Sequence, residues 1–530
     1  MRTLNAQRPT LNARRFPLLR ASTSPLSVER FFLLAAASLA LLAPARADEA
    51  TKITKPAVAR AEEVSTKQLS VVRVNVTNQP WDFSKPWGKR APFSRRAIGA
   101  VLPGNRVLVT AELVGNANYV ELETAAGGQK APAAVEAVDY ECNLAVLKTD
   151  DTAFLKNIAP LELTTAAVGD ILSVWQLENN GNLLVTRGPM TTAEVSRYPG
   201  DDSPFLIYRL TAPLQFRDNS FVLPVVKDGK LAGLLMRYDN TTNNADLIPA
   251  PVIQRFLADA AAPPYEGFPR MGMTFSFTRD PQFRRYLGLK ETAGGVYVSD
   301  VIPDGSAAQS GIQKDDVILK VDGLAVDQDG NYEDRDYGKI AVTHLFSTRH
   351  AVGDKVPFTV FRKGETKDIT VTLAHRDIRN YVVEPYIIDR APKFAIVGGF
   401  VLQELSRQYL KEWGNDWAKK APEQFVYFDR MQNDLFKEGP KKIVFVSRVL
   451  PTAATVGYED LGMLVVTKIN DVALQSLADV ATALEKPKDA LHKIEFDGEP
   501  TTVYLDAKAV SDEGEALRKK YRLPALQRLE

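Results

Sequence analysis

Short apolar runs dominate the first half of the chain and constrain its fold more than any other feature. Between residues 70 and 260 these runs are rich in Val, Ile, Leu and Thr, and turn residues separate them. Examples are Ser70–Val76, Arg106–Thr110 and Leu144–Lys148. No amphipathic helical pattern is sustained until Pro251–Ala261. This pattern is typical of an all-β barrel or sandwich that ends in a helix.

Two mixed segments follow, in which short strands alternate with short helices. Residues 265–380 contain predicted strands at Gly295–Val301 and Asp316–Val321, with a short helix at Ser306–Gly311 between them. Residues 394–510 repeat this order more loosely and with little sequence identity. We therefore predict two small α+β domains that repeat a structure rather than a sequence.

Composition restricts the class of protein that these segments form. Hydrophobic residues make up 45% and charged residues 25% of the 530 residues, the usual mixture of a globular protein. The net charge is +1 and no Lys/Arg-rich run stands out, so nucleic acid is not an expected partner. Cys142 is the single cysteine, so packed cores must stabilise the fold, and we expect Cys142 to be a buried structural residue. No metal-ligand cluster, phosphate loop or dinucleotide fingerprint occurs, so we expect no metal and no cofactor.

The N-terminus has the pattern of a secretory signal peptide. A basic segment ends at Arg30, residues 31–42 are apolar or small, and Ala45-Arg46-Ala47 forms a small-x-small cleavage site. The apolar run is shorter than the roughly 20 residues that cross a bilayer, which argues against a transmembrane anchor. We expect a signal peptide over residues 1–47, cleavage after Ala47, and a periplasmic protein with no membrane span in its mature chain.

Five segments, in their order along the chain, point to one family. They are Pro80–Trp87, Glu141–Ala145, Ile248–Ile253, Glu266–Met273 and Ile443–Asp460. With these segments the chain resembles Deg/HtrA-type serine proteases, and its C-terminal half is similar to the Deg9-like branch. The resemblance implies a mainly β protein, with a trypsin-like double β-barrel followed by two PDZ-like α+β domains. The implied boundaries are a signal peptide at 1–47, a (pseudo)protease domain at 48–262, PDZ domain 1 at 263–385, a PDZ-like domain 2 at 390–512 and a C-terminal tail at 513–530.

The catalytic positions of the family hold other residues in this chain. Where the family has histidine, in a segment like V-L-T-N-A-H, Val107–Glu112 ends in Glu112. Where the family has aspartate before an apolar strand, this chain has Asn143. The nucleophile segment matches only at Asn219-Ser220, and a gapless count places Asn219 at the nucleophile position. Three glycines of that segment, which present backbone N–H groups to the substrate oxygen, are replaced.

The number and position of the histidines also indicate that the catalytic triad is incomplete, without reference to any family. The chain has four histidines, all beyond residue 343: His344, His350, His375 and His492. A serine nucleophile needs a neighbouring base, and an exposed Glu with a pKa of about 4.3 is poorly matched to a serine hydroxyl. We predict a degenerate triad at Glu112, Asn143 and Ser220, with Glu112 either hydrogen-bonded to Asn143 or a solvated loop acid. An active site rebuilt around Ser220, with Glu112 or a lysine as base, is the alternative.

The first PDZ-like domain keeps the parts of a peptide groove. PDZ domains add an extended peptide C-terminus to a strand edge, beside a glycine-containing loop and a helix. We expect the augmented strand at Met273–Phe277. Two methionines suit an adaptable apolar pocket, and Arg270 adds charge for a carboxylate. The expected peptide-binding residues are Arg270, Met271, Gly272, Met273, Val342, Leu345 and Phe346. The alternative is that the apolar members of this set form core and the groove is closed.

The second PDZ-like domain carries a long insert, Gln403–Lys437, with several aromatic side chains. Such an insert either covers a groove or makes a subunit contact, and the resemblance favours assembly. We therefore expect a homo-oligomer.

These expectations combine in one function. The chain is expected to be an exported, catalytically inactive pseudoprotease that acts as a peptide-binding, chaperone-like or scaffold protein in the cell envelope. Its expected partners are peptides or unfolded proteins at PDZ domain 1 and an active Deg protease. The alternatives are an active serine endopeptidase in protein quality control and a structural oligomer whose grooves are filled from within.

Overall fold

The computed structural model describes residues 69–200, 203–215, 222–435 and 441–530. The expected signal peptide at residues 1–47 and the expected nucleophile Ser220 lie outside the described residues. Within the part of the chain that the structure describes, none of the helices has the length and apolar character needed to cross a bilayer.

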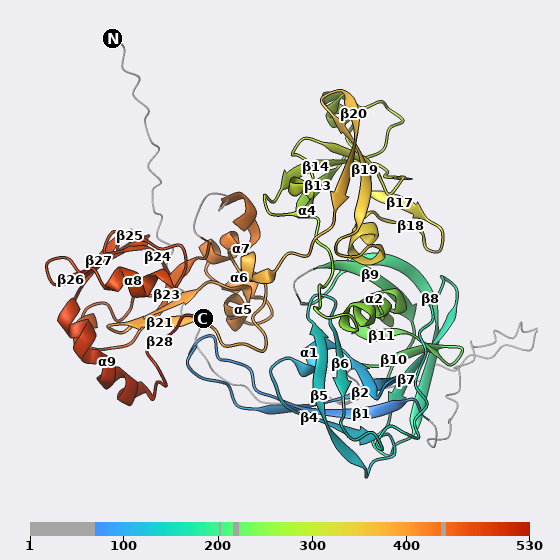
Figure 1. Ribbon diagram of the computed structural model, residues 1–530, viewed down its shortest axis with the longest axis horizontal. Helices are drawn as coiled ribbons and strands as arrows, with labels where there is room; N and C mark the ends of the chain where they lie inside the picture. Colours follow the sequence, from blue (N-terminus) through green and yellow to red (C-terminus); the bar gives the residue numbers. More distant parts are fainter. Residues whose placement is uncertain (1–68, 201–202, 216–221, 436–440) are drawn as a thin grey trace, which may run out of the picture. The chain divides into compact units, whose positions relative to one another are not determined.

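Six antiparallel strands close into a first barrel, drawn in blue and teal in Figure 1. In order around the barrel they are β1 (Val71–Asn78), β2 (Phe93–Leu102), β3 (Arg106–Val109), β6 (Leu144–Lys148), β5 (Lys130–Asp139) and β4 (Ala117–Thr124). Alternate residues of β1 face inward, so Val72, Val74 and Val76 are buried and the residues between them are partly exposed. A single-turn helix, α1 (Ala111–Val114), follows β3.

Six further strands close into a second barrel. In order they are β10 (Pro224–Lys227), β11 (Lys230–Asp239), β12 (Asn244–Pro249), β9 (Pro204–Thr211), β8 (Leu183–Arg197) and β7 (Ile171–Leu177). Helix α2 (Ala250–Ala260) follows β12 and buries Val252, Ile253 and Phe256. The expectation of an all-β region that ends in a helix is therefore confirmed as a trypsin-like double barrel.

A mixed sheet forms the third unit. Its main strands follow the order β13 (Met273–Phe277), β14 (Val296–Val301), β15 (Val317–Val321), β19 (Lys355–Arg362) and β20 (Glu365–Thr372). The remaining elements are α3 (Pro281–Leu287), α4 (Ser306–Gln309), β16 (Leu324–Ala325), the hairpin β17 (Asn331–Asp334) with β18 (Gly338–Ala341), and a π-helix, η2 (Leu345–Arg349). The sequence predicts a helix from Val342. In the structure Thr343 and His344 are helical, and the π-helix η2 follows them directly.

A second mixed sheet follows a 3-10 turn, η3 (Ile378–Asn380). Its strands follow the order β27 (Thr502–Asp506), β26 (Leu491–Asp497), β24 (Leu464–Ile469), β23 (Val444–Val449), β22 (Phe400–Glu404), β21 (Phe394–Val397) and β28 (Gln527–Arg528), with β25 (Val472–Ala473) beside β24. A 3-10 turn, η5 (Ala453–Thr455), and two helices, α8 (Asp479–Leu484) and α9 (Ala507–Tyr521), complete it. Residues 513–530, expected as a tail, contain the end of α9 and β28, and β28 pairs with β21.

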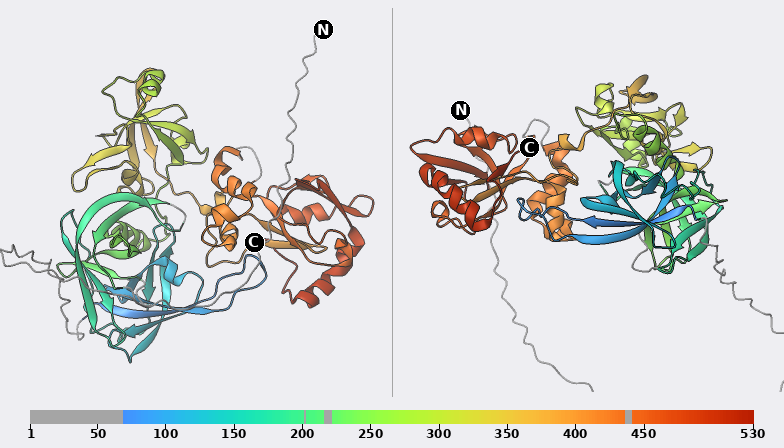
Figure 2. Two further views of the ribbon diagram at one scale, coloured as in Figure 1. Left: turned by 180° about the vertical axis from the view of Figure 1, so that it is seen from behind. Right: turned by 60° about the horizontal axis from the view of Figure 1, so that its bottom comes forward.

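The insert of this domain is helical and packs on its own sheet. It contains α5 (Arg407–Leu410), η4 (Lys411–Trp413), α6 (Trp417–Lys420) and α7 (Glu423–Leu435), drawn in orange in Figure 2. Tyr409 and Phe425 lie edge-on against Phe445 of β23, with ring centroids 4.8 and 5.0 Å apart. The aromatic residues of the insert therefore stabilise a local core.

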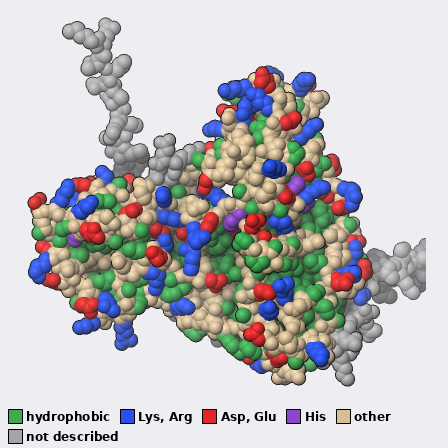
Figure 3. Space-filling view, in the orientation of Figure 1, with side chains coloured by type: hydrophobic (Ala, Val, Ile, Leu, Met, Phe, Trp, Pro, Cys, Tyr) green, Lys and Arg blue, Asp and Glu red, His purple; other side chains and the backbone are tan. Residues whose placement is uncertain are grey.

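Two large hydrophobic cores organise the described residues. One runs through both barrels and the first mixed sheet, and the other lies in the second mixed sheet. Over the face drawn in Figure 3, acidic and basic side chains are interspersed, in keeping with the net charge of +1.

Candidate functional site

The fold brings the expected catalytic positions Glu112 and Asn143 together. Glu112 lies in α1, and Asn143 precedes β6 with a left-handed φ of 56°, a conformation that Asn tolerates. The backbone N–H of Glu112 donates to Asn143 Oδ1 at 3.0 Å. Among the described residues, Asn143 Nδ2 has no hydrogen-bond partner. The contact between the two positions is thus backbone to side chain, and the Glu112 carboxylate takes no part in it.

The carboxyl group of Glu112 lies in a partly desolvated position. Glu112 is exposed as a residue, but protein around its carboxyl group displaces water and raises its pKa, while the charge of Arg95 opposes this shift. Arg95 also donates to the backbone oxygen of Glu112 at 2.7 Å. The four histidines are engaged elsewhere: His344 with Tyr332, His350 with Asp322 and Asp354, His375 with Glu141, and His492 with Asn470.

Cys142 is fully buried beside these positions, as the sequence predicts. Burial raises the pKa of its thiol well above the usual value. A buried thiol of this kind stays protonated and is inert as a nucleophile. The structure therefore supports a packing role for Cys142.

A buried polar cluster joins the barrel to the first mixed domain. Glu141, 4% exposed, forms an ion pair with Arg270 at 2.8 Å and lies 3.4 Å from His375 Nε2. Burial alone raises the pKa of Glu141, but the charge of Arg270 and the hydrogen bond from His375 outweigh it and lower the pKa. Asp139 lies next to this cluster and accepts from the Tyr265 hydroxyl. Burial and the charge of Glu141 raise the pKa of Asp139 to about 6.

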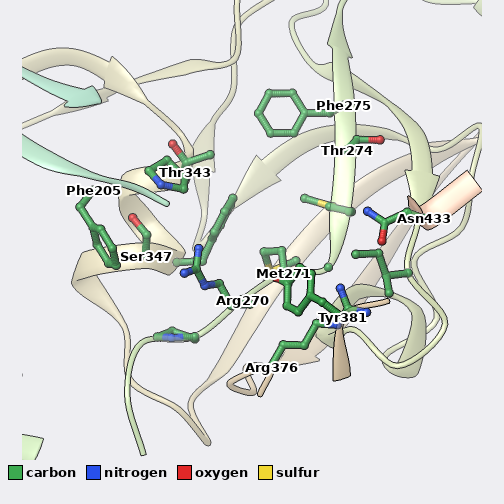
Figure 4. A pocket seen from close by; sticks show the side chains of 16 residues that line it. Phe205, Arg270, Met271, Thr274, Phe275, Thr343, Ser347, Arg376, Tyr381 and Asn433 are labelled. Carbon is green, nitrogen blue, oxygen red and sulfur yellow. The ribbon is translucent and has the colours of Figure 1, made fainter. Parts of the chain in front are cut away.

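A pocket of about 280 Å³ lies along β13. Figure 4 shows Phe205 and Ser347 on one side of it and Thr274 and Asn433 on the other. Five of the seven expected peptide-binding residues line this pocket: Arg270, Met271, Gly272, Met273 and Phe346.

Two expected residues of the groove lie elsewhere. Val342 and Leu345 are 2% and 0% exposed and belong to the hydrophobic core; Met271 and Phe346 line the pocket but are also buried members of that core. The reason is local geometry, because a π-helix that begins at Leu345 presents a different set of side chains from the expected α-helix. Thr343 and Ser347 line the pocket in their place.

The loop before β13 has the backbone of a close-packed turn. Gly272 has a φ of 65°, and a Cβ at this position lies 2.6 Å from the Cα of Gly305. β13 pairs with β14 and is the terminal strand in the order of its sheet. One edge of β13 therefore faces the pocket, as strand addition by a peptide requires.

Comparisons with known proteins agree with this architecture. Two stretches match models of the PDZ domain, residues 269–373 and residues 383–527. Protease Do-like 2 of the chloroplast, from Arabidopsis thaliana, is 26% identical over 464 residues, which is 86% of this chain and 74% of that protein. A serine protease DegP homolog from Plasmodium falciparum is 19% identical over 523 residues, 79% of this chain and 58% of that protein.

The chain contains two PDZ domains and is similar, over most of its length, to Do-like proteases of the Deg/HtrA type. Its double barrel and its two PDZ domains follow one another in the order that the sequence predicts. A solved structure, the HtrA-type protease AlgW with a decapeptide, matches 59% of this Deg/HtrA-type chain and 99% of its own chain, at 19% identity and a TM-score of 0.44.

Sequence reasoning misses several residues of the pocket in this Deg/HtrA-type chain. Phe205 comes from the second barrel, Arg376 and Tyr381 from the segment after the first PDZ domain, and Asn433 from α7. These residues lie far along the chain from the glycine-containing loop at Arg270–Met273, and they share no sequence motif with it. Only the tertiary fold brings them together, so no local pattern identifies them.

Proposed function

We propose that this Deg/HtrA-type chain is a catalytically inactive protein that binds peptide segments in the groove of its first PDZ domain. The observation that carries the proposal is the hydrogen bond from the Glu112 backbone to the Asn143 side chain. The resemblance assigns these two positions to the imidazole base and the carboxylate of a trypsin-like protease.

Neither residue replaces the missing groups. A carboxamide carries no charge to stabilise an imidazolium, and the barrel domain contains no histidine before residue 344. Loss of a triad member lowers acyl-transfer rates by several orders of magnitude in serine proteases. The proposal therefore predicts binding of peptide without its cleavage.

Peptide binding rests on the groove itself. A terminal strand with one edge toward an apolar pocket is the arrangement that PDZ domains use for strand addition. Met273 offers partly exposed, adaptable apolar surface to a ligand side chain, and Met271 and Phe346, which are mostly buried, line the same pocket.

One observation favours a second candidate function, an active serine endopeptidase with a site rebuilt around Ser220. The pKa of Glu112 is raised, and a general base with a higher pKa is a stronger proton acceptor. In this alternative Glu112 takes the proton of the serine hydroxyl.

The cell-envelope setting belongs to the same proposal. Export by a signal peptide over residues 1–47, placement in the Deg9-like branch, a homo-oligomeric state and partnership with an active Deg protease are its further components. They rest on the sequence pattern and on the resemblance.

A binding experiment tests the proposed groove. The probe is fluorescein-labelled casein, an unfolded protein, and fluorescence anisotropy measures its binding to the purified chain. Met273→Asp places a charge in the apolar groove, and we expect it to weaken binding about tenfold, the cost of burying a charge against apolar surface. Ser276→Asp is the matched control, because Ser276 is exposed on the same strand and does not line the pocket. Equal binding by both variants and the wild-type chain contradicts the proposal.

A further inference from the structure

Helix α7 in the insert of the second PDZ domain has more large apolar side chains than its own core uses. Phe425 and Val426 are buried in the core of the insert. Three others on the same helix stay in contact with solvent: Tyr427 is 51% exposed, Met431 37% and Leu435 41%. Adjoining exposed apolar side chains mark an interaction surface more often than single ones do.

The three exposed side chains form one row, which we call the apolar row. They are spaced by four residues, so each lies about one helical turn beyond the last on the same side of α7. Asn433, two residues after Met431 and therefore nearly opposite it around the helix, lines the groove of the first PDZ domain (Figure 4). The apolar row thus points away from that groove as well as from the core of the insert.

Two opposite charges follow one flank of the apolar row. Arg430 and Asp434 are both exposed, and they also lie one turn apart along α7. A two-fold axis perpendicular to the helix, at Met431, keeps this flank on the same side in both copies but reverses its direction. Arg430 of each copy then lies beside Asp434 of the other, with about 3 Å between the two positions along the helix axis.

This arrangement of charges favours a second copy of the chain as the occupant of the face. Packing the two helices parallel places the charged flanks on opposite sides, so only the antiparallel arrangement joins them. Rows of side chains four residues apart are also the ridges that pack together in the commonest class of helix pairs. The face is therefore complementary to itself in both shape and charge.

We infer that the apolar row of α7 is a contact between two copies of this chain, which pack antiparallel about a two-fold axis near Met431. In this contact Met431 of one copy meets Met431 of the other, and Tyr427 of each copy meets Leu435 of the other. The inference goes beyond peptide binding and gives the proposed homo-oligomer a specific surface.

Cysteine cross-linking of the full chain tests the predicted register. Cys142 is the single native cysteine and is fully buried, so an introduced thiol on α7 is the reactive one. We expect Met431→Cys to form a covalent dimer under air oxidation with copper–phenanthroline, because residue 431 lies on the axis. Tyr427→Cys alone should not link, since its two copies lie about 12 Å apart along the helix axis and a disulfide needs Cα atoms within about 7 Å. A mixture of Tyr427→Cys and Leu435→Cys should link.

Val456→Cys is the matched control, because Val456 is 74% exposed in the same domain and lies outside α7. Circular dichroism melts show whether each variant is folded. Equal linking by Met431→Cys and Val456→Cys overturns the inference, because the links then come from random collisions. Linking by Tyr427→Cys alone without linking by Met431→Cys also overturns it, because the register is then different.

Sedimentation velocity of the cysteine-free-surface variants tests the charges. We expect Met431→Asp to raise the dissociation constant between copies at least about tenfold. Arg430→Glu should raise it about fivefold, and adding Asp434→Lys to Arg430→Glu should restore it. An unchanged assembly in folded Met431→Asp overturns the inference and leaves a homo-oligomer joined by another surface. Casein binding that persists in Met431→Asp keeps the proposed peptide binding separate from this contact.

Discussion

Glu141 is the residue at which the contacts between the barrel and the first PDZ domain converge. Arg270 and His375 both reach it, from opposite ends of the PDZ domain in sequence. Glu141 is also two residues before Asn143, within one of the segments that resemble the family. A change at this carboxylate is therefore expected to affect both the PDZ groove and the neighbourhood of Asn143.

The ion pair between Arg270 and Glu141 should behave as a buried pair. We predict that Arg270→Met lowers the free energy of unfolding by about 3 kcal/mol, because it leaves the Glu141 carboxylate buried without its counter-charge. The double variant Arg270→Met with Glu141→Gln should recover most of this loss. Urea denaturation of both variants measures it, and a double variant no more stable than the single one contradicts the account.

His375 should make stability depend on pH. The hydrogen bond to Glu141 raises the pKa of His375, against the desolvation and the charge of Arg270, which lower it. A raised pKa means that the protonated form is favoured in the folded chain. Protonated His375 therefore stabilises the folded chain. This stabilisation is fully present below the pKa of about 6.5 that His has in the unfolded chain, and it is lost as the pH rises through the higher pKa of the folded chain.

We predict that His375→Gln is less stable than the wild-type chain by about 1 kcal/mol near pH 6, and that the difference shrinks as the pH rises. Thermal melts of both proteins across this range measure the effect. A difference that is constant with pH shows that His375 acts by packing alone.

At the scale of elements, the loop before β13 combines two constraints on Gly272. Its left-handed φ of 65° costs a residue with a Cβ about 1–2 kcal/mol. The new Cβ also meets backbone of Gly305 at 2.6 Å, and backbone cannot rotate away as a side chain does. Both constraints act on the loop before β13, which lines the groove.

We predict that Gly272→Ala lowers the free energy of unfolding by about 2 kcal/mol and weakens peptide binding about tenfold. Gly364→Ala is the matched control, because Gly364 has a φ of 91° in a hairpin turn with no atom within 4 Å of an added Cβ. The control should lose stability without losing affinity. Full affinity in Gly272→Ala contradicts the role of this loop.

The sequence predicts some elements of the groove better than others. The strand Met273–Phe277 is confirmed with its predicted bounds, because its apolar pattern is local. The helix predicted from Val342 is present from Thr343, but most of it is a π-helix, and no local pattern in the sequence predicts that helix type. No local pattern identifies Arg376 as a pocket residue, because segments far apart along the chain build that pocket.

At the scale of the whole molecule, the chain combines two closed barrels with two PDZ domains, and our proposal assigns its function to binding rather than to catalysis. Phe205 of the barrel domain lines the groove of the first PDZ domain. Glu141 of the barrel domain forms an ion pair with Arg270, which lines the same groove. Such a barrel supports a binding site that belongs to its neighbour.

Cleavage of an unfolded substrate tests this account most directly. Purified chain and its Ser220→Ala variant are incubated with casein, and electrophoresis follows the length of the substrate over several hours. The account predicts intact casein with both proteins, in the same solutions in which casein binds. Cleavage by the wild-type chain that is lost in Ser220→Ala contradicts it, and shows that the active site has been rebuilt around Ser220.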